Sequence, residues 1–292
     1  MNIARPFIRV IPRLDIKGPN LVKGVHFEGL RVLGKPERFA RLYYESGADE
    51  LMYVDVVASL YGRNSLLHVV ERTAREIFIP LTVGGGLRTI DDIRTVLRAG
   101  ADKVSLNTAA VKHPDLVRQV VRRFGSSTVV ISIEAMKRPD GSYEAYTDNG
   151  RERTGLDVFE WAIRVAELGA GEILVTSIDR EGTGRGFDVE LTRRIAESVP
   201  IPVLAGGGSS SAHHIVDVIQ TGRCQGVCVA SMLHYGLIQQ YRSDHDFEEG
   251  VTAFLESRRE HSVFAGITVS EVKAELLRNG IAARPSEALM HV

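Results

Sequence analysis

Short sequence patterns of this chain recur at one fixed interval of 122 residues. The first is a glycine turn followed by an acidic residue, and the second is an Ile-Pro pair followed by three glycines. They lie at Gly47–Glu50 and Gly169–Glu172, and at Ile79–Gly86 and Ile201–Gly208. Glycine turns in register in two halves indicate one supersecondary plan used twice. If the glycines bind phosphate, the duplication also predicts a ligand with a phosphate at each end.

Short β-branched runs alternate with amphipathic segments along the chain. The predicted strands are Ile8–Asp15, Leu51–Val56, Leu81–Val83, Lys103–Leu106, Thr128–Glu134, Ile173–Ser177, Val203–Ala205 and Gly226–Val229. The predicted helices are Pro36–Ser46, Ser65–Ile77, Thr89–Ala99, Pro114–Phe124, Asp157–Leu168, Glu190–Ser198, Ala212–Gln220 and Val269–Asn279. Apolar strands alternating with helices are typical of a parallel sheet covered by helices. Eight such units in roughly 250 residues favour an α/β fold of the (β/α)₈ TIM-barrel type over a doubly wound sheet, with four units in each half-barrel repeat.

Two insertions interrupt this alternation within one predicted domain over residues 1–292. Residues 137–154 follow the fifth strand and contain Asp140-Gly141, a hairpin turn signal. Residues 237–266 lie between the eighth strand and the last helix, and Phe247–Arg259 within them has a helical pattern. Both follow the carboxyl ends of strands, so we expect them on the barrel face that carries active sites. The second is equally compatible with a tolerated surface insertion.

Composition excludes several function classes. Of the 292 residues, 44% are hydrophobic and 25% are charged, and the net charge of −1 gives no overall field that favours nucleic acid or an anionic membrane. No apolar run approaches the roughly 18 residues of a membrane span, and the N-terminus lacks the apolar core of a signal peptide. The cysteines, Cys224 and Cys228, lie four apart near one strand, so we expect both on one face and no disulfide between them. These features predict a cytoplasmic protein.

Glycine triplets end the third and seventh predicted strands. Glycine lets the backbone approach a ligand and point several N–H groups at it. The fourth and eighth strands each run into a helix whose start offers hydroxyl and N–H donors. Because turns after neighbouring strands lie on one face, the pattern predicts two phosphate sites. The residues that we assign to them are Gly86, Asn107 and Thr108 in the first half, and Gly207, Gly208, Ala230 and Ser231 in the second.

Carboxylates stand at the ends of two opposing strands. Asp15 ends the first strand and Glu134 ends the fifth, so in an eight-stranded barrel they flank a substrate from opposite sides. This placement suits a general acid and a general base. Lys23, in the first βα loop, either neutralises a phosphate or is a solvated loop lysine. Glu181 lies just past the sixth strand and is a further candidate for the substrate site.

Charged residues also mark the beginnings of four strands. They are Arg9, Glu50, Lys103 and Glu172, on strands one, two, four and six. Around a narrow barrel such residues meet at the axis, where buried charges have to pair. The pattern alone favours a structural layer of ion pairs that closes the bottom of the barrel.

Several stretches together resemble the cyclase subunit of imidazole glycerol phosphate synthase, from histidine biosynthesis. The resemblance covers nearly the whole chain except residues 237–266. The supporting stretches are Leu14–Lys17, Gly47–Leu51, Thr82–Gly86, Gly100–Ala110 and Gly171–Arg180. The resemblance implies a TIM barrel of two duplicated halves.

The resemblance also implies a reaction and a partner. A glutaminase subunit would dock on the N-terminal barrel face and send ammonia through the barrel. At the C-terminal face the ammonia would convert a phosphoribulosyl-formimino aminoimidazole carboxamide nucleotide to imidazole glycerol phosphate and aminoimidazole carboxamide ribonucleotide. Asp15 then corresponds to a catalytic carboxylate, and the four charged residues at the strand beginnings correspond to the ammonia entrance. Asn107, Thr108 and the glycine turns correspond to phosphate-site positions.

The chain departs from this family pattern at its substrate side. Glu134 and Glu181 stand where the family has aspartate, and the added methylene moves each carboxylate by roughly 1 Å, which can cost on the order of 100-fold in rate. Gly206 replaces a serine that holds phosphate, and Arg13 adds a positive charge beside Asp15. The 237–266 insertion adds further residues near the second phosphate site.

Three hypotheses therefore remain open. The first is the ordinary histidine-pathway cyclase with compensated changes. The second is a paralogue that uses glutaminase-derived ammonia to aminate or amidinate another phosphorylated acceptor, such as a nucleotide-linked sugar. The third is a binding or regulatory barrel without turnover, against which the charged ring argues because a pure binder needs no ammonia route. The persistence of the substrate-side stretches favours the first.

Cofactors are not expected from this sequence. His213 and His214 open a helix, and no other histidine has a neighbour with metal-ligand spacing. Nothing in the sequence predicts a nicotinamide or flavin site.

Overall fold

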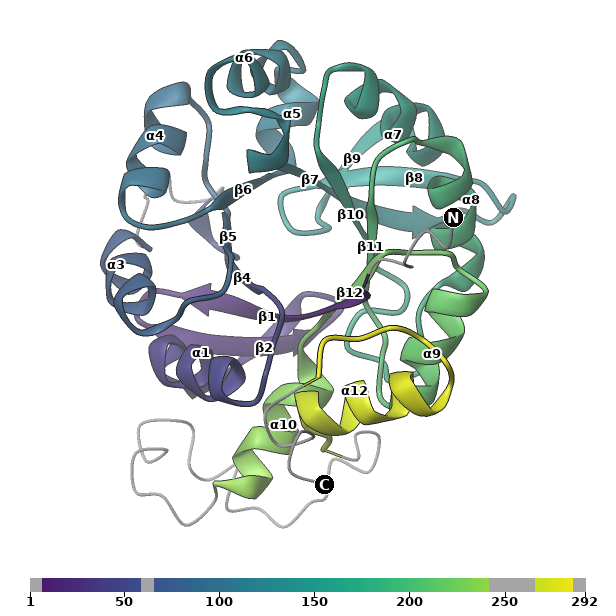
Figure 1. The fold of residues 1–292 in the computed structure, drawn as a ribbon. Helices are drawn as coiled ribbons and strands as arrows, with labels where there is room; N and C mark the ends of the chain where they lie inside the picture. The colour runs from purple at the N-terminus through teal and green to yellow at the C-terminus, as the bar shows by residue number, and fades with distance from the viewer. Residues whose placement is uncertain (1–6, 59–65, 242–265, 286–292) are drawn as a thin grey trace, which may run out of the picture.

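Eight parallel strands close into a barrel with helices around it in the computed structural model, which describes residues 7–58, 66–241 and 266–285 (Figure 1). Each strand pairs in parallel with the next, and the ring closes where β12 pairs with β1 and β7 with β10. The barrel strands are β1 (Arg9–Lys17), β4 (Leu51–Asp55), β5 (Leu81–Gly84), β6 (Lys103–Leu106), β7 (Val129–Lys137), β10 (Glu172–Ser177), β11 (Val203–Gly206) and β12 (Gly226–Val229). The predicted (β/α)₈ barrel is confirmed.

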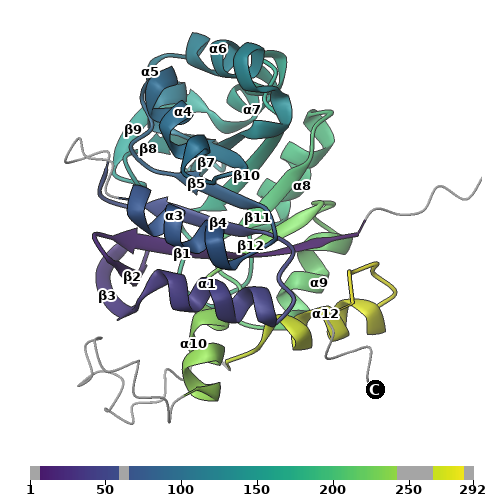
Figure 2. The same ribbon diagram turned by 60° about the vertical axis from the view of Figure 1, so that its left-hand side comes forward.

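Helices cover the outside of this barrel and connect its strands (Figure 2). They are α1 (Pro36–Glu45), α3 (Leu67–Glu76), α4 (Ile90–Arg98), α6 (Asp115–Phe124), α7 (Val158–Glu167), α8 (Val189–Ser198), α9 (Ala212–Gln220) and α12 (Val269–Arg278). Two more, α5 (Thr108–Lys112) and α10 (Ser231–Gln240), follow β6 and β12, and a 3₁₀ turn precedes β7 at Ser126–Thr128. No helix within the described ranges is long and apolar enough to span a membrane.

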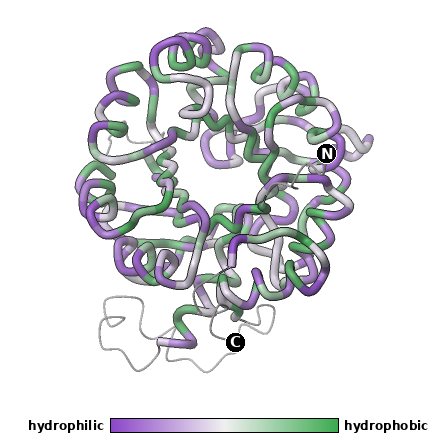
Figure 3. Tube along the Cα trace, in the orientation of Figure 1, coloured by the Kyte–Doolittle hydropathy of each residue, from purple (hydrophilic) through white to green (hydrophobic). Residues whose placement is uncertain are grey.

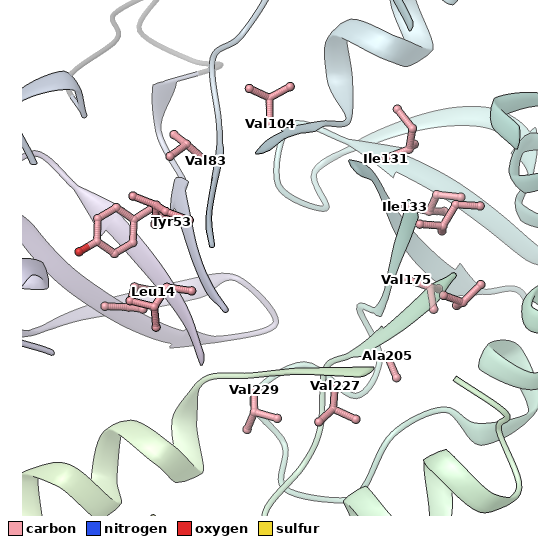
Figure 4. Close-up of a cluster of buried hydrophobic side chains, with 14 of the residues drawn as sticks. Leu14, Tyr53, Val83, Val104, Ile131, Ile133, Val175, Ala205, Val227 and Val229 are labelled. Atoms are coloured by element: carbon pink, nitrogen blue, oxygen red, sulfur yellow. The ribbon is translucent and has the colours of Figure 1, made fainter. Parts of the chain in front are cut away.

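Apolar side chains form two separate layers because successive residues of a strand point to opposite sides. The larger layer lies between the strands and the helices, where side chains such as Leu14, Tyr53 and Val175 point away from the barrel axis (Figure 4). A smaller layer fills the barrel interior and consists of Ile11, Met52, Val130, Leu174, Leu204 and Cys228. Figure 3 shows the same arrangement as mostly hydrophobic strands inside helices that alternate between hydrophobic and hydrophilic residues.

The two halves of the barrel repeat the same elements at the interval found in the sequence. Helix α1 begins at Pro36 and α7 at Val158, and both are 10 residues long, so they are 122 positions apart. The same offset relates α3 to α8 and α4 to α9, from first residue to last. The duplicated half-barrel is therefore a property of the fold as well as of the glycine turns.

Each half also carries a β-hairpin after its first strand. The predicted hairpin turn at Asp140-Gly141 is present in the second half, where it connects β7 to the antiparallel β8 (Tyr143–Thr147), and β9 (Glu152–Asp157) pairs in turn with β8. The first half has a hairpin that the sequence reading missed, formed by β2 (Asn20–Val25) and β3 (Glu28–Gly34). Moving residues 137–154 back by 122 positions places them at residues 15–32, so the repeat contained this signal.

The last quarter of the chain differs from the sequence-based expectations at its two cysteines. The predicted helix Phe247–Arg259 lies outside the described residues, and α10 extends to Gln240, so the first residues of the 237–266 segment continue a helix. The expectation that the cysteines share one face is wrong. Both are free and buried, but Cys224 packs in the outer layer and Cys228 in the inner one. Cys224 precedes β12, so strand alternation does not connect the two positions.

Candidate active site

Four side chains of alternating charge form a ring around the barrel axis at the N-terminal ends of the strands. Arg9 Nη1 lies 2.8 Å from Glu50 Oε1, and its Nη2 donates to Glu172. Lys103 Nζ closes the ring, 2.9 Å from Glu50 Oε1 and 3.5 Å from Glu172 Oε2. The four predicted entrance residues are thus brought together, and every charge in the ring has two partners of opposite sign.

The inner apolar layer separates this ring from the other end of the barrel. On β1 the inward positions follow one another as Arg9, Ile11, Arg13 and Asp15, because alternate residues face the axis. Ile11 belongs to the inner layer, so the charged ring lies below that layer and Arg13 above it. A route along the axis from ring to upper end is therefore lined by hydrophobic side chains.

A buried cluster of charges lies at the carboxyl ends of the strands. Arg13 Nε donates to Asp15 Oδ1 at 2.8 Å, and Lys23 Nζ lies 3.3 Å from Asp15 Oδ2. Lys23 also donates to Glu181. All four side chains are buried, and Lys23 comes from β2 of the unpredicted hairpin. Lys23 is therefore neither a solvated loop lysine nor a free cation, because two carboxylates hold it.

Asp15 stays ionised in this cluster. Burial alone would raise the pKa of Asp15, but the charges of Arg13 and Lys23 outweigh it and hold the pKa below the ordinary 3.8. The same pairing raises the pKa of Lys23, since Glu181 and Asp15 outweigh the opposing effect of burial. Asp15 lines neither the cavity beside the Gly84–Gly86 turn nor the one beside the Gly206–Gly208 turn. Its carboxylate is thus turned toward its cations.

Glu134 has the opposite electrostatic environment. Burial raises its pKa to about 7, while the charge of Arg13 and the hydrogen bond from the Gly150 N–H oppose the rise. That N–H, in the turn between β8 and β9, lies 2.7 Å from Glu134 Oε2. Glu134 also lines the larger cavity. A carboxyl with this pKa can both donate and accept a proton near neutral pH.

The larger cavity, of about 370 Å³, lies over the first half of the barrel. Its wall includes the first predicted phosphate residues, Gly86, Asn107 and Thr108, and the cationic side chains of Arg88 and Lys112 besides that of Arg13. The turn after β5 needs glycine, because Gly85 has φ +93° and an added Cβ would lie 2.3 Å from a carbonyl oxygen of Asp55. The first set of predicted phosphate residues therefore surrounds one cavity.

The smaller cavity, of about 20 Å³, lies over the second half. The second predicted phosphate residues line it, namely Gly207, Gly208, Ala230 and Ser231, together with Glu181. Gly208 has φ +101°, and an added Cβ would lie 2.3 Å from the Gly186 carbonyl oxygen. Arg13 lines both cavities, so its guanidinium lies between them.

The tip of the β2–β3 hairpin contacts this end of the barrel. The backbone N–H of His26 donates to the Glu181 carbonyl at 3.0 Å, and His26 Nδ1 lies 2.6 Å from the Ile178 carbonyl. The Phe27 ring centroid lies 5.4 Å from Arg13 Cζ, within the range of a cation–π contact. The hairpin therefore brings an aromatic ring to the charged cluster.

Sequence reasoning missed three features of this site. It treated Arg13 only as a charge beside Asp15, it did not include Phe27, and it did not include the Asp148–Gly150 turn. Asp148 and Asn149 have φ +51° and +61°, and Asn149 lines the larger cavity. The Asn-Gly pair was a local signal for this turn, whereas the place of Phe27 follows from the missed hairpin. Within the described ranges, no group of three His, Cys, Asp or Glu residues is placed to hold a metal ion.

Known proteins match this chain over most of its length. The family model described as "Histidine biosynthesis protein" matches residues 9–239. One relative, imidazole glycerol phosphate synthase subunit HisF of Legionella pneumophila, is 59% identical over 201 residues, which are 69% of this chain and 95% of the relative. The subunit of the same name from Alkaliphilus metalliredigens (strain QYMF) is 46% identical over 241 residues, 82% of this chain and 96% of the relative. This chain therefore belongs to the histidine biosynthesis protein family.

Proposed function

We propose that this chain is an ammonia-dependent cyclase subunit of imidazole glycerol phosphate synthase. It would convert a phosphoribulosyl-formimino aminoimidazole carboxamide nucleotide to imidazole glycerol phosphate and aminoimidazole carboxamide ribonucleotide. The names of the two relatives and the match to the family model support this assignment. The free, buried cysteines fit a cytoplasmic enzyme, because thiols stay reduced there.

The observation that carries the proposal is the contrast between two carboxyl groups at opposing strand ends. Asp15 is held ionised by two cations, whereas Glu134 has a pKa of about 7 and lines the larger cavity. Paired groups whose environments move their pKa values apart are typical of acid–base catalysis. We assign proton transfer to Glu134, and we assign to Asp15 the negative charge that orients Arg13 and Lys23 beside the substrate.

The two cavities support a substrate with a phosphate at each end. Each includes a glycine turn and the start of a helix, and the turns are related by the half-barrel repeat. The larger cavity would hold one phosphate near Gly86 and Thr108, and the smaller would hold the other near Gly207 and Gly208. The reacting centre then lies between the cavities, close to Glu134 and Arg13.

The lower end of the barrel supports an ammonia route from a glutaminase partner. The charged ring lies below an inner apolar layer, which neutral ammonia can cross more easily than ammonium. Two aromatic side chains are exposed where β1 and β5 begin, Phe7 at 61% and Phe78 at 81% of their surface. Tyr44, at the end of α1, packs against Phe78 with ring centroids 6.1 Å apart. Exposed aromatic residues are enriched in protein interfaces, so we place the partner on this face.

One assay tests the reaction without the partner. The purified protein receives the histidine-pathway nucleotide and a high concentration of ammonium salt at alkaline pH. We expect turnover that falls by on the order of 100-fold or more in Glu134→Gln, because general acid–base catalysis contributes about that much. Asp15→Asn should also remove most turnover. Tight binding of the nucleotide without turnover would indicate a non-catalytic barrel and would contradict the proposal.

A second function is favoured by one specific observation. The charge of Arg13 lies between the cavities, and the two glutamates stand where the resembling family has aspartate. These differences fit a paralogue that passes ammonia to another phosphorylated acceptor, such as a nucleotide-linked sugar. In the same assay this alternative predicts neither turnover nor binding of the histidine-pathway nucleotide.

The partner assignment has its own test. Phe78→Ser removes the most exposed aromatic side chain of the lower face, so it should weaken the complex with a glutaminase subunit at least tenfold. Ammonium-driven turnover should stay unchanged, because Phe78 lies where β5 begins, at the end of the barrel opposite to the cavities. Ile163→Ser, which removes an exposed apolar side chain of α7, is the matched control. Equal weakening by both substitutions would refute the assignment to this face.

A further inference from the structure

The smaller cavity has an unusual charge balance for a phosphate site. Glu181 lines it, and a Cβ added at Gly207 would lie 3.3 Å from Glu181 Oε2, so the carboxylate lies against the glycine turn. A phosphate in this turn would meet a negative charge at short range, which is unfavourable in a buried site. Lys23 offsets Glu181, but Asp15 shares the same ammonium. The cavity therefore needs another cation before it can hold an anion.

Arg13 is the one cationic side chain among the described residues that line this cavity. It is buried, with 6% of its surface exposed. Its Nε is engaged by Asp15 at 2.8 Å, and Phe27 covers one face of the guanidinium. In the described part of the chain, its two Nη groups donate no hydrogen bond. The Nη groups of Arg13, on the edge of the guanidinium away from Asp15, are thus available to donate hydrogen bonds to a ligand.

A neighbouring hydroxyl also lacks a partner. Thr176 Oγ1 is completely buried in β10, lines the smaller cavity, and has no hydrogen-bond partner among the described residues. Buried polar atoms are nearly always hydrogen-bonded in native proteins, so an unpaired one needs a ligand or a water. The hydroxyl and the free guanidinium edge together point to an acceptor in this cavity. A group with several oxygens and a negative charge satisfies both.

We propose that Arg13 is a substrate-binding residue. It binds the substrate phosphate that occupies the smaller cavity, at the Gly206–Ser209 turn. The inference rests on the proposed function, because that function supplies a substrate with two phosphates. Arg13 compensates for Glu181 and supplies paired donors, so this end of the site selects by charge. A substrate with a neutral group at that end should bind poorly, while the phosphate at the larger cavity is unaffected.

Inorganic phosphate tests the inference without any turnover. The backbone amide resonances of Gly207 and Gly86 report on the smaller and larger cavities, and phosphate is titrated against chloride at constant ionic strength. In the wild type we expect saturable shifts at both glycines. Arg13→Met should weaken the response of Gly207 at least tenfold and that of Gly86 much less, because Arg88 and Lys112 also line the larger cavity whereas Arg13 is the one cation lining the smaller. Arg13→Lys, which keeps the charge but not the paired donors, should lie between.

Three outcomes would overturn the inference. One is a wild-type Gly207 amide that does not respond to phosphate, which needs no variant to fold. Another is an unchanged Gly207 response in Arg13→Met, and the third concerns acetate. Lys112→Met, at the wall of the larger cavity, is the control and should weaken the Gly86 response only. A protein that binds phosphate as expected but does not turn over the histidine-pathway nucleotide would contradict the proposed reaction and leave the role of Arg13 standing. Acetate at equal concentration shows whether a carboxylate replaces phosphate, and a tighter response to acetate would contradict the phosphate assignment.

Discussion

The raised pKa of Glu134 predicts a specific pH dependence of stability. Its ordinary pKa is 4.5 and its value in the fold is about 7, so the native state favours the protonated acid. A group whose pKa is raised on folding contributes stability that is fully present below its unfolded pKa and is lost as pH rises through its folded pKa. Glu134→Gln mimics the protonated acid at every pH, so the variant should escape this loss.

The size of the effect follows from the two pKa values. At about 1.4 kcal/mol for each pH unit between 4.5 and about 7, ionising Glu134 in the fold costs about 3 kcal/mol. At pH 5.5 about 1 kcal/mol of this cost is already present, because the unfolded group is then largely ionised. The variant should therefore gain about 2 kcal/mol over the wild type between pH 5.5 and pH 8.5.

Urea unfolding at a series of pH values measures this difference. Both proteins are unfolded from pH 5.5 to pH 8.5 at constant ionic strength, and the free energies of unfolding are subtracted at each pH. Glu152→Gln is the matched control, because it makes the same chemical change at an exposed position on β9. A difference between Glu134→Gln and wild type that stays flat, or that shrinks as pH rises, would refute the assignment of a raised pKa to Glu134.

Three further substitutions test other parts of the structure. Asp15→Asn should lose more stability at pH 7 than at pH 3, because a carboxylate whose pKa is lowered on folding contributes stability that is fully present above its ordinary pKa of 3.8 and is lost progressively as pH falls through its folded pKa; urea unfolding at the two pH values reads this out. Lys273 is fully buried and lies 2.7 Å from Asp49 Oδ1, so Lys273→Met should cost on the order of 3 kcal/mol, and the double variant with Asp49→Asn should cost less than the sum. Additive costs would show that the pair is not coupled. Gly208→Ala should lower stability by about 2 kcal/mol more than Gly141→Ala in thermal unfolding, because both have positive φ but only Gly208 has a neighbour within 4 Å of an added Cβ. Equal losses would leave backbone conformation as the whole effect.

Local patterns predicted most of the fold. Strand and helix positions follow from the spacing of apolar residues, which depends on each segment alone. The capping box of α4, in which Thr89 accepts from the Asp92 N–H, is likewise local, because its two residues lie three positions apart in the chain. The β2–β3 hairpin was missed because its strands lack a clean alternation, with buried residues only from Leu21 to Lys23 on β2. Only comparison of the two halves would have revealed it.

The sequence predicted which residues form the candidate site, but not the electrostatic environment of each side chain. The sequence placed Asp15 and Glu134 at opposing strand ends, and the structure has both there. It did not show that Asp15 is turned toward Arg13 and Lys23 while Glu134 faces a cavity. The position of a residue in the sequence predicts which strand carries its side chain and at which end of the barrel. Which charges surround it depends on other strands, and those charges decide its pKa.

By itself, the sequence of this protein determined a duplicated barrel with glycine turns, charged strand beginnings and two strand-end carboxylates, because each of these is encoded in local spacing. Tertiary structure alone decided that Arg13 lies between two cavities, that Lys23 is held by two carboxylates, and that Glu134 has a pKa near neutrality. The physical reason is that electrostatic interactions and burial act through space, between residues far apart in the chain such as Lys23 and Glu181, which are 158 positions apart.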